Sequence, residues 1–282
     1  MILVTGAKGF IGSNLAAHIP SSDLIKWDLE EGKRNSIEDI DQTVELIIHL
    51  APISSTQEED TYKLAELNIL ASTELLEYAV KNDIAFIYAS SASVYGSGAS
   101  GFCEDKPLEP LNYYAISKAA FDMFAAQKMK DHPDAKIFGL RFFNVYGRGE
   151  HNKGPMASPI HKFVNQARSS NEIKIFEGSE NYVRDFISVD DVVSIILASK
   201  DFQKSGIYNV GTGISRSFLD VAKIISSHTG AKIVEIPFPP HLVDKYQAFT
   251  RSDNTKLLDA QGHSFLTLEE GIAKYIGGMA KE

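Results

Sequence analysis

A glycine-rich turn directly after the first apolar segment constrains this chain most. Residues 5–12 read Thr-Gly-Ala-Lys-Gly-Phe-Ile-Gly and stand between an expected strand and an expected helix. In that context the glycine spacing predicts a dinucleotide site. We expect Gly6 to permit the tight turn, Gly9 to let the backbone approach a pyrophosphate, and Gly12 to allow close packing of helix and strand. The N-terminus of the helix would then face the phosphates.

The first half of the chain alternates short apolar runs with helical patterns. The expected strands are Ile2–Thr5, Leu24–Asp28, Leu46–Leu50, Ile84–Ala89 and Lys136–Phe143, and the expected helices are Phe10–His18, Asp60–Lys81 and Tyr113–Met129. This alternation predicts an α/β fold with a Rossmann-like, doubly wound parallel sheet that is covered on both faces.

The segment between Asp28 and Leu46 is unusually short, and it carries an acidic run from Glu38 to Asp41. A complete strand with two crossover helices hardly fits into it. We therefore expect the region of the third strand to be shortened or missing, which would leave the adenine side of a cofactor groove more open.

From about Gly147 the strict alternation fades. The expected elements are helices Ile160–Arg168, Val192–Ser199, Leu219–Thr229 and Leu268–Met279, strands Lys174–Phe176, Ile207–Val210 and Lys232–Ile236, and a return segment Tyr182–Val189. We predict that residues 1–147, with crossings near 182–213, form a dinucleotide-binding domain. Residues 148–282 would form mainly a smaller, C-terminal substrate-binding lobe.

The composition argues against several classes of protein. The net charge of -9 disfavours nucleic acid as a partner, because phosphate binding requires a basic face. The N-terminus has no secretory pattern, and the apolar runs are too short to span a membrane. The lone Cys103 cannot form a disulfide within the chain, and the eight histidines lack metal-ligand spacing. We expect a cytoplasmic protein without a metal site or a membrane partner.

Ser91, Tyr114 and Lys118 form a candidate acid/base set. Lys118 follows Tyr114 by one helical turn, so both side chains share one side of the helix. An ammonium group and an oxidised nicotinamide ring would each stabilise a phenolate, and we therefore expect a lowered pKa for Tyr114. Ser91 could hydrogen-bond the substrate oxygen beside it. With the glycine turn, this set predicts hydride chemistry on a sugar or alcohol.

The residues after the second strand leave the choice of dinucleotide open. Asp28 ends that strand, where an acidic side chain usually bonds the adenosine ribose hydroxyls of NAD. Lys33 and Arg34 follow shortly after and could neutralise the 2′-phosphate of NADP instead. A solvated, charged loop is the alternative explanation for all three residues.

Longer motifs in the second half carry a resemblance to a known family. Arg184–Phe186 and Asn209–Gly213 are shared across nucleotide-sugar enzymes, whereas Met156–Ser158, Phe176–Ser179 and Tyr246–Thr250 are typical of heptose epimerases. Together with the glycine turn and the Tyr/Lys pair, they make the chain similar over nearly its whole length to the extended short-chain dehydrogenase/reductase family, and within it to the heptose epimerases.

This resemblance implies a set of cofactor contacts, to NADP or else to NAD. Besides the three glycines, the implied residues are Phe10, Ile11, Asp28, Leu29, Arg34, Leu50, Ala51, Pro52, Ile53, Ser54, Asn68, Tyr114, Lys118, Val145 and Lys153.

It also implies a nucleotide-sugar site, formed by Ser91, Ser93, Asn144, Pro155, Lys162, Phe176, Glu177, Gly178, Ser179, Arg184 and Tyr246. A guanidinium such as that of Arg184 can grip a diphosphate bidentately, although an ion pair with a nearby aspartate is an alternative. Tyr246 could instead pack in the core. The chain departs from the family pattern at Pro155, where a small hydroxyl residue is usual, and at Lys162, where histidine is usual.

The reaction that the resemblance implies is redox-neutral epimerisation of an ADP-linked heptose at C6″, in a homo-oligomer. Tyr114 and Lys153 would be the two acid/base groups, although Lys153 could also be a solvated or phosphate-binding lysine. The alternatives are a nucleotide-sugar 4-epimerase or a 4,6-dehydratase, and a non-catalytic NADP-binding regulator. A dehydratase usually has an Asp-Glu pair where this chain has Ala92 and Ser93.

Overall fold

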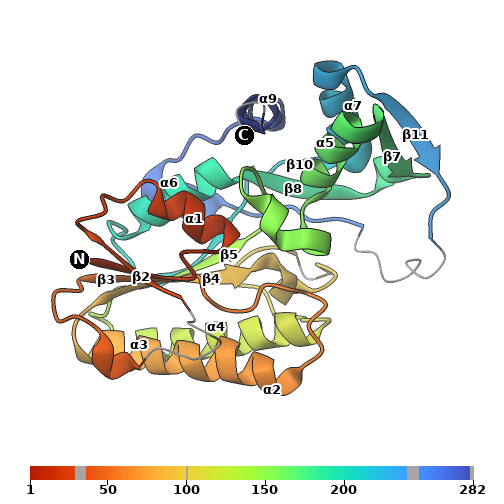
Figure 1. Ribbon diagram of the computed structural model, residues 1–282. Coiled ribbons are helices and arrows are strands. Elements are labelled where there is room, and N and C mark those ends of the chain that lie inside the picture. Colours follow the sequence, from red (N-terminus) through yellow and green to blue (C-terminus); the bar gives the residue numbers. More distant parts are fainter. Residues whose placement is uncertain (29–35, 100, 240–247, 280–282) are drawn as a thin grey trace.

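A six-stranded parallel sheet forms the centre of the larger part of the molecule (Figure 1). The computed structural model describes residues 1–28, 36–99, 101–239 and 248–279. The strands lie in the order β2-β1-β3-β4-β5-β9, with bounds Leu24–Trp27, Ile2–Thr5, Leu46–His49, Ala85–Ser91, Ile137–Phe142 and Gly206–Val210. Each pair of neighbours is parallel, as the alternating sequence pattern predicts.

Helices cover both faces of this sheet because its strands send alternate side chains to opposite sides. Leu46 and Ile48 of β3 join a core with α1 (Phe10–Ala16) and α6 (Val189–Ser199), whereas Ile47 joins a core with α3 (Ala71–Lys81) and α4 (Tyr113–Asp131). Figure 1 shows these two layers above and below the sheet. The prediction of a doubly wound, Rossmann-like fold is therefore confirmed.

Strand β2 is the outermost strand on its side of the sheet in the part of the chain that the structure describes. Among the described residues no strand pairs with the outer side of β2, and residues 36–45 contribute only the 3₁₀ turn η1 (Ile37–Asp39) before β3 begins. The predicted shortening of the third-strand region is confirmed to that extent. Leu29, Lys33 and Arg34 lie outside the described residues.

The predicted long helix after β3 has an irregular middle. It consists of α2 (Thr61–Leu64), a π-helical turn η2 (Ala65–Leu70) and α3. Asp60 caps it by accepting a hydrogen bond from the Lys63 backbone N–H at 3.0 Å. The overall course of the helix matches the prediction for Asp60–Lys81, but nothing in its apolar spacing indicated the π turn.

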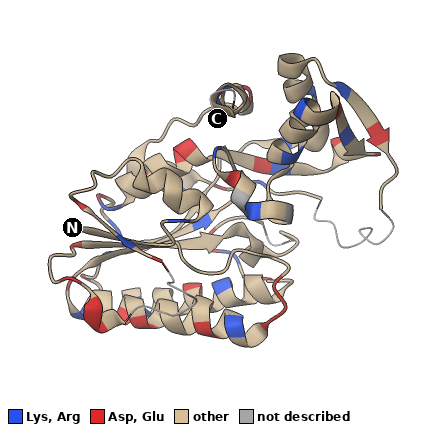
Figure 2. Cartoon of the chain, viewed as in Figure 1, with Lys and Arg blue, Asp and Glu red and all other residues tan. Residues whose placement is uncertain are grey.

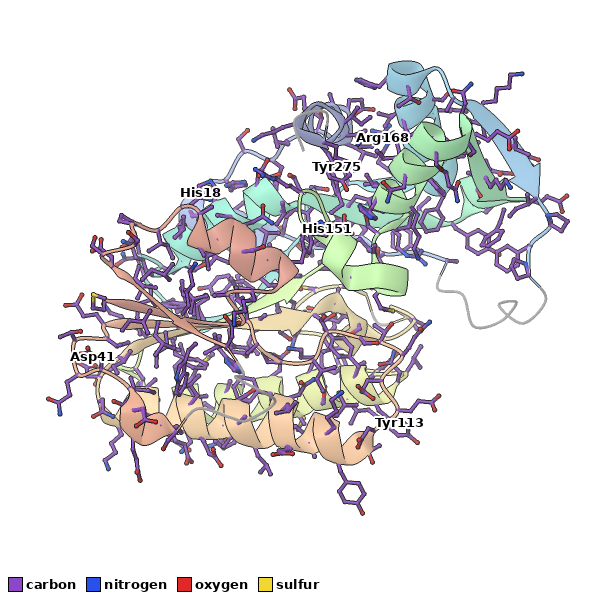
Figure 3. All side chains as sticks on the ribbon, viewed as in Figure 1. His18, Asp41, Tyr113, His151, Arg168 and Tyr275 are labelled. Atoms are coloured by element: carbon purple, nitrogen blue, oxygen red, sulfur yellow. The ribbon has the colours of Figure 1, made fainter. Side chains whose placement is uncertain are left out.

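Most of the second half packs around a core of its own. That core joins α5 (Pro159–Ser170), α7 (Phe218–Thr229) and α9 (Leu268–Met279) with β7 (Glu172–Phe176), β8 (Val183–Ser188) and β11 (Lys232–Ile236). The Arg168 guanidinium on α5 donates to the Met279 carbonyl on α9 at 3.3 Å, and Figure 3 shows Arg168 and Tyr275 where these two helices approach.

Several short elements were not predicted. They are β6 (Asn144–Tyr146), β10 (Ser215–Ser217), α8 (Thr255–Gln261) and the turns η3 (Ala92–Tyr95), η4 (Glu150–Met156) and η5 (Ser179–Asn181). Strands β10, β8 and β6 form one small sheet, and β11 pairs with β7 in another.

Acidic and basic positions are mixed along α2, α3 and α4 in the view of Figure 2. No helix within the described segments is long and apolar enough to cross a bilayer.

Candidate active site

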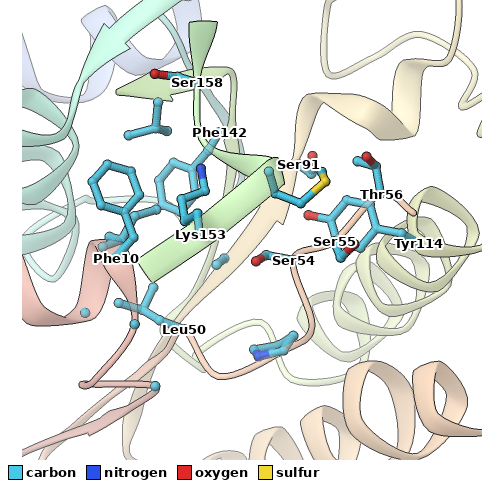
Figure 4. A pocket seen from close by; sticks show the side chains of 18 of the residues that line it. Phe10, Leu50, Ser54, Ser55, Thr56, Ser91, Tyr114, Phe142, Lys153 and Ser158 are labelled. Atoms are coloured by element: carbon cyan, nitrogen blue, oxygen red, sulfur yellow. The ribbon is translucent and has the colours of Figure 1, made fainter. Parts of the chain in front are cut away.

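A cleft of about 750 Å³ opens at the carboxyl ends of β1, β3, β4 and β5 (Figure 4). This is the edge where open α/β sheets usually bind ligands. The cleft is lined by the glycine turn and the start of α1, the loop after β3, the end of β4, α4, and two segments at residues 142–145 and 153–159. Of the predicted site residues, the structure places Phe10, Ile11, Leu50, Ala51, Pro52, Ser54, Ser91, Tyr114, Lys118, Asn144, Val145, Lys153 and the three glycines on its walls.

Two glycines of this turn, Gly6 and Gly12, have no room for a side chain. Gly6 has φ +72°, and a Cβ added to it would lie 2.8 Å from the backbone of Ala51. A Cβ on Gly12 would lie 2.0 Å from the carbonyl oxygen of Gly6, so Gly12 packs mainly against the turn itself rather than against a strand. The bare backbone therefore forms one wall of the cleft, and a dinucleotide fits such a wall because its pyrophosphate can approach closely.

Asp28 lies beside this turn. Its Oδ1 accepts a hydrogen bond from the backbone N–H of Lys8 at 3.1 Å. Lys8 also lines the cleft, although the sequence analysis did not select it. The position of this basic residue inside the glycine turn could have indicated that Lys8 lies at the cofactor site. Leu29 and Arg34, the other expected contacts on this side, lie outside the described residues.

The predicted acid/base set comes together at the inner end of the cleft. Tyr114 and Lys118 are both buried on α4, whose first turn is capped by the Asn112 side chain at 2.8 Å from the Ala115 backbone nitrogen. The Lys118 ammonium donates to the Ala89 carbonyl at 2.8 Å and lies 5.9 Å from the centroid of the Tyr114 ring. Ser91, the last residue of β4, lines the cleft beside Tyr114 (Figure 4).

Burial controls the ionisation of this set. It raises the pKa of Tyr114, an effect that the neighbouring Ser91 hydroxyl partly offsets and to which the nearby Asp122 carboxylate adds. The prediction of a lowered Tyr114 pKa is therefore wrong for the chain alone. Burial also lowers the pKa of Lys118 to about 8, and Asp122 partly offsets this effect. The reason is that the interior penalises both charged forms more than their neighbours stabilise them.

Asn68 lies behind the cleft wall rather than on it. Its Oδ1 accepts from the Ile53 backbone N–H at 2.7 Å, and its Nδ2 donates to the Ile53 carbonyl at 3.2 Å and to the Ser117 hydroxyl at 2.9 Å. These bonds join the loop after β3 to α4. Asn68 and Ile53, both expected as cofactor contacts, thus support the residues that line the cleft.

Lys153 lies on the wall opposite Tyr114 (Figure 4). Its ammonium is 4.9 Å from the centroid of the Phe10 ring and 4.0 Å from Glu150 Oε2. Burial lowers the pKa of Lys153, Glu150 opposes that change, and the charge of Lys162 adds to it. A partly buried lysine of this kind can exchange a proton more readily than a solvated one.

Glu150 shapes the loop that carries Lys153. It is fully buried and accepts hydrogen bonds from the Gly147 N–H at 2.9 Å, the Ser158 N–H at 2.6 Å and the Ser158 hydroxyl at 2.8 Å. The sequence analysis did not select Glu150, since a lone glutamate in a Gly/Pro-rich loop gives no signal of burial. The side chain of Pro155 is outside what the structure describes.

The remaining predicted substrate residues do not line this cleft. Phe176 is the last residue of β7 and its ring contacts that of Phe238, and Glu177, Gly178 and Ser179 follow the strand. Arg184 is buried on β8, and its guanidinium lies 5.4 Å from the centroid of the Phe218 ring. Ser93 and Lys162 are also absent from the lining, and Tyr246 lies outside the described residues.

Asp185 organises the neighbouring chain segments. Its carboxylate accepts from Thr212, Gly213 and Ser252 through five hydrogen bonds of 2.7–3.0 Å. The Asn209–Gly213 motif is thereby tied to the segment after Thr250. The aspartate of the Arg184–Phe186 motif is thus a structural residue.

This fold and cleft define a class of dinucleotide-dependent enzymes, and comparison with known proteins identifies the family. Residues 2–211 match the NAD dependent epimerase/dehydratase family, and the chain belongs to that family. The resemblance noted in the sequence is confirmed at this level.

Solved structures of several members are similar over essentially the whole chain. ADP-L-glycero-D-manno-heptose-6-epimerase from Helicobacter pylori is 28% identical with a TM-score of 0.84, covering 100% of this chain and 96% of that one. UDP-glucose 4-epimerase from Thermotoga maritima is 25% identical with a TM-score of 0.83, covering 99% and 98%. UDP-N-acetylglucosamine 4-epimerase from Methanobrevibacter ruminantium, at 24% identity and a TM-score of 0.86 over 99% and 98%, shares the fold.

Proposed function

We propose that this protein interconverts ADP-D-glycero- and ADP-L-glycero-β-D-manno-heptose by transient oxidation at C6″, with NADP as its tightly bound dinucleotide. The observation that carries the proposal is the placement of Tyr114 and Lys153 on opposite walls of one cleft. Inversion of a carbinol requires proton transfer in two orientations of the sugar, so two acid/base groups facing one another suit it. The heptose motifs in the sequence and the similarity to the Helicobacter pylori enzyme support the choice of sugar.

The reaction is balanced without a net oxidant. A bound nicotinamide dinucleotide supplies the hydride acceptor and later the hydride donor, and in its oxidised form it places a positive charge in the cleft. One of the two facing groups takes the proton from the C6″ hydroxyl as the carbon loses hydride, and a ketone results. After the ketone rotates in the cleft, the other group gives a proton to the oxygen as the opposite face of the carbon regains hydride, and proton exchange with solvent then restores both groups.

The residues of the chain are suited to these steps. Ser91, which lines the cleft beside Tyr114, would hold the sugar oxygen beside the phenol. Burial lowers the pKa of Lys153, so its amine is available as a proton acceptor closer to neutral pH. Each positioned acid/base group typically contributes on the order of 10²–10⁴ in rate.

We further propose that residues 148–282 form mainly the substrate-binding lobe, with Arg184 holding the diphosphate and the region of Phe176–Ser179 holding the nucleotide. In this proposal the protein is a cytoplasmic homo-oligomer, and its product is a heptose precursor for the lipopolysaccharide core. NADP rather than NAD is proposed because Lys8 lines the cleft beside Asp28 and the sequence continues with two further basic residues.

A nucleotide-sugar 4-epimerase is the second candidate. It is favoured by the similarity to the Thermotoga maritima UDP-glucose 4-epimerase. The same Tyr/Lys chemistry would serve it, and the difference would lie in which carbon faces the cofactor. The absence of an Asp-Glu pair after Ser91 disfavours a dehydratase.

Proton NMR of the purified protein with ADP-D-glycero-β-D-manno-heptose tests the proposal, with NADP and NAD added to parallel samples. We expect conversion to the L-glycero epimer without net formation of reduced dinucleotide, and faster with NADP. A protein that binds dinucleotide but converts no heptose would refute the heptose assignment. UDP-, GDP- and dTDP-hexoses would then identify a 4-epimerase.

A further inference from the structure

Arg141 joins two separate elements of the candidate active site. It lies on β5 and is only 3% exposed. Its Nε donates to Asp122 Oδ2 on α4 at 2.8 Å, and its Nη1 donates to the Tyr95 hydroxyl on η3 at 2.8 Å. One planar guanidinium therefore contacts both elements at the same time, which the fork geometry of arginine permits.

These two contacts lie next to the proposed catalytic residues. Asp122 follows Lys118 by one helical turn and Tyr114 by two turns, so the three side chains share one face of α4. Tyr95 is the last residue of the single turn η3, which begins directly after Ser91. Ser91 thus stands at the junction of β4 and η3, and Arg141 connects η3 to the helix that carries Tyr114 and Lys118.

The hydrogen bonds allow one arrangement only. Tyr95 accepts from Arg141, which has no acceptor of its own, and therefore donates its proton to Asn209 Oδ1 at 2.7 Å. The Asn209 amide cannot be reversed, because its Nδ2 donates to the Phe102 and Asp253 carbonyls at 2.9 and 3.0 Å. All of these side chains are buried and hydrogen-bonded to one another. The connection between α4 and η3 through Arg141 is therefore rigid.

We propose that Arg141 and Tyr95 are positioning residues that hold the Ser91 turn at a fixed distance from Tyr114 and Lys118. This proposal rests on the proposed roles of Ser91, Tyr114 and Lys118. An ion pair that served stability alone would need only Asp122 and Arg141. The bond to the Tyr95 hydroxyl is the part that reaches the Ser91 turn.

Tyr95→Phe tests the link, and Tyr88→Phe is its matched control. Both tyrosines are 1% exposed, and both variants remove one buried hydroxyl from the same network. The Tyr88 hydroxyl donates to Asp122 Oδ1 at 3.1 Å, and within the described part of the chain it forms no hydrogen bond to η3. We expect Tyr95→Phe to lower kcat about 10- to 100-fold, with KM for the nucleotide-sugar and the melting temperature close to those of Tyr88→Phe. Tyr88→Phe should keep most of the wild-type kcat.

Arg141→Lys is the second variant. It keeps a positive charge beside Asp122, but a single ammonium cannot form both bonds of the guanidinium. We expect a loss of kcat similar to that of Tyr95→Phe. Equal kcat values in Tyr95→Phe and Tyr88→Phe, or a wild-type kcat in Arg141→Lys, would overturn the proposal.

Failure of the proposed function would look different, because the wild-type protein would then convert no nucleotide-sugar. Crystal structures of the wild type and of Tyr95→Phe decide the positioning role in that case. A longer distance between the Ser91 and Tyr114 hydroxyl oxygens in the variant supports the role, and an unchanged distance overturns it.

Discussion

Replacing Lys118 with methionine should stabilise the protein at neutral pH while it removes a proposed catalytic group. Burial lowers the pKa of Lys118 from its ordinary 10.5 to about 8. At about 1.4 kcal/mol for each pH unit, the charged lysine then costs roughly 3 kcal/mol in the folded state at pH 7. Loss of its hydrogen bond to the Ala89 carbonyl offsets about 1 kcal/mol of this gain. The variant Lys118→Met should therefore be more stable by about 2 kcal/mol.

The pH dependence of this difference follows from proton binding. Below pH 8 the lysine is protonated in both the folded and the unfolded chain, and the full cost is present. Between pH 8 and 10.5 the unfolded chain retains the proton that the folded chain has lost, so wild-type stability rises relative to the variant. The advantage of Lys118→Met should shrink through this interval and be largely lost near pH 10.

Urea unfolding of the dinucleotide-free proteins at pH 7, 8, 9 and 10 measures the difference. Lys130→Met is the control, because Lys130 lies exposed on the same helix. A Lys118→Met protein that is no more stable than the wild type at pH 7, or whose advantage is the same at pH 7 and 10, would refute the reasoning.

Three further substitutions test other parts of the cleft. Tyr114→Phe should lower kcat by on the order of 10²–10⁴ without loss of dinucleotide binding; turnover near the wild-type rate would exclude the phenol as an acid/base group. Gly12→Ala should abolish dinucleotide binding in a fluorescence titration, because the new methyl group would lie 2.0 Å from the Gly6 carbonyl, and retained affinity would show that the turn is more adaptable than its geometry indicates. Glu150→Gln should lower the free energy of unfolding by about 1–3 kcal/mol, since one carboxylate oxygen that accepts from Gly147 or Ser158 becomes a donor; an unchanged urea midpoint would contradict this.

The fold was largely predictable because its strands and helices follow simple rules of spacing. The continuous apolar runs and the glycine turn were enough to predict the main sheet. The bounds of β11 and α9 also agree with the prediction. The short strands β6 and β10 were missed because three-residue pairings depend on tertiary contacts rather than on local pattern. The π turn at Ala65–Leu70 was missed for a similar reason, since apolar spacing does not distinguish one extra residue in a long helix.

The candidate site was predictable where a motif specifies a position, and less so where burial decides the chemistry. Spacing alone predicted that Tyr114 and Lys118 share one face of α4, but it could not show that burial would raise the pKa of Tyr114. Nor could it show that Asn68 bonds the backbone of Ile53 instead of lining the cleft. Glu150 and Arg141 belong to no local pattern, because their partners are brought together only by the folded chain.

The π turn between α2 and α3 has a consequence for how the chain tolerates changes of length. A π turn holds one residue more than the same length of α-helix. A regular helix could therefore accommodate the deletion of a single residue within Ala65–Leu70. A deletion within α3 would instead rotate every following side chain by about 100° away from the core. The helix should therefore tolerate a one-residue deletion best at this turn. Loss of Asn68, or a change in the direction of its side chain, would nevertheless release the loop that lines the cofactor cleft.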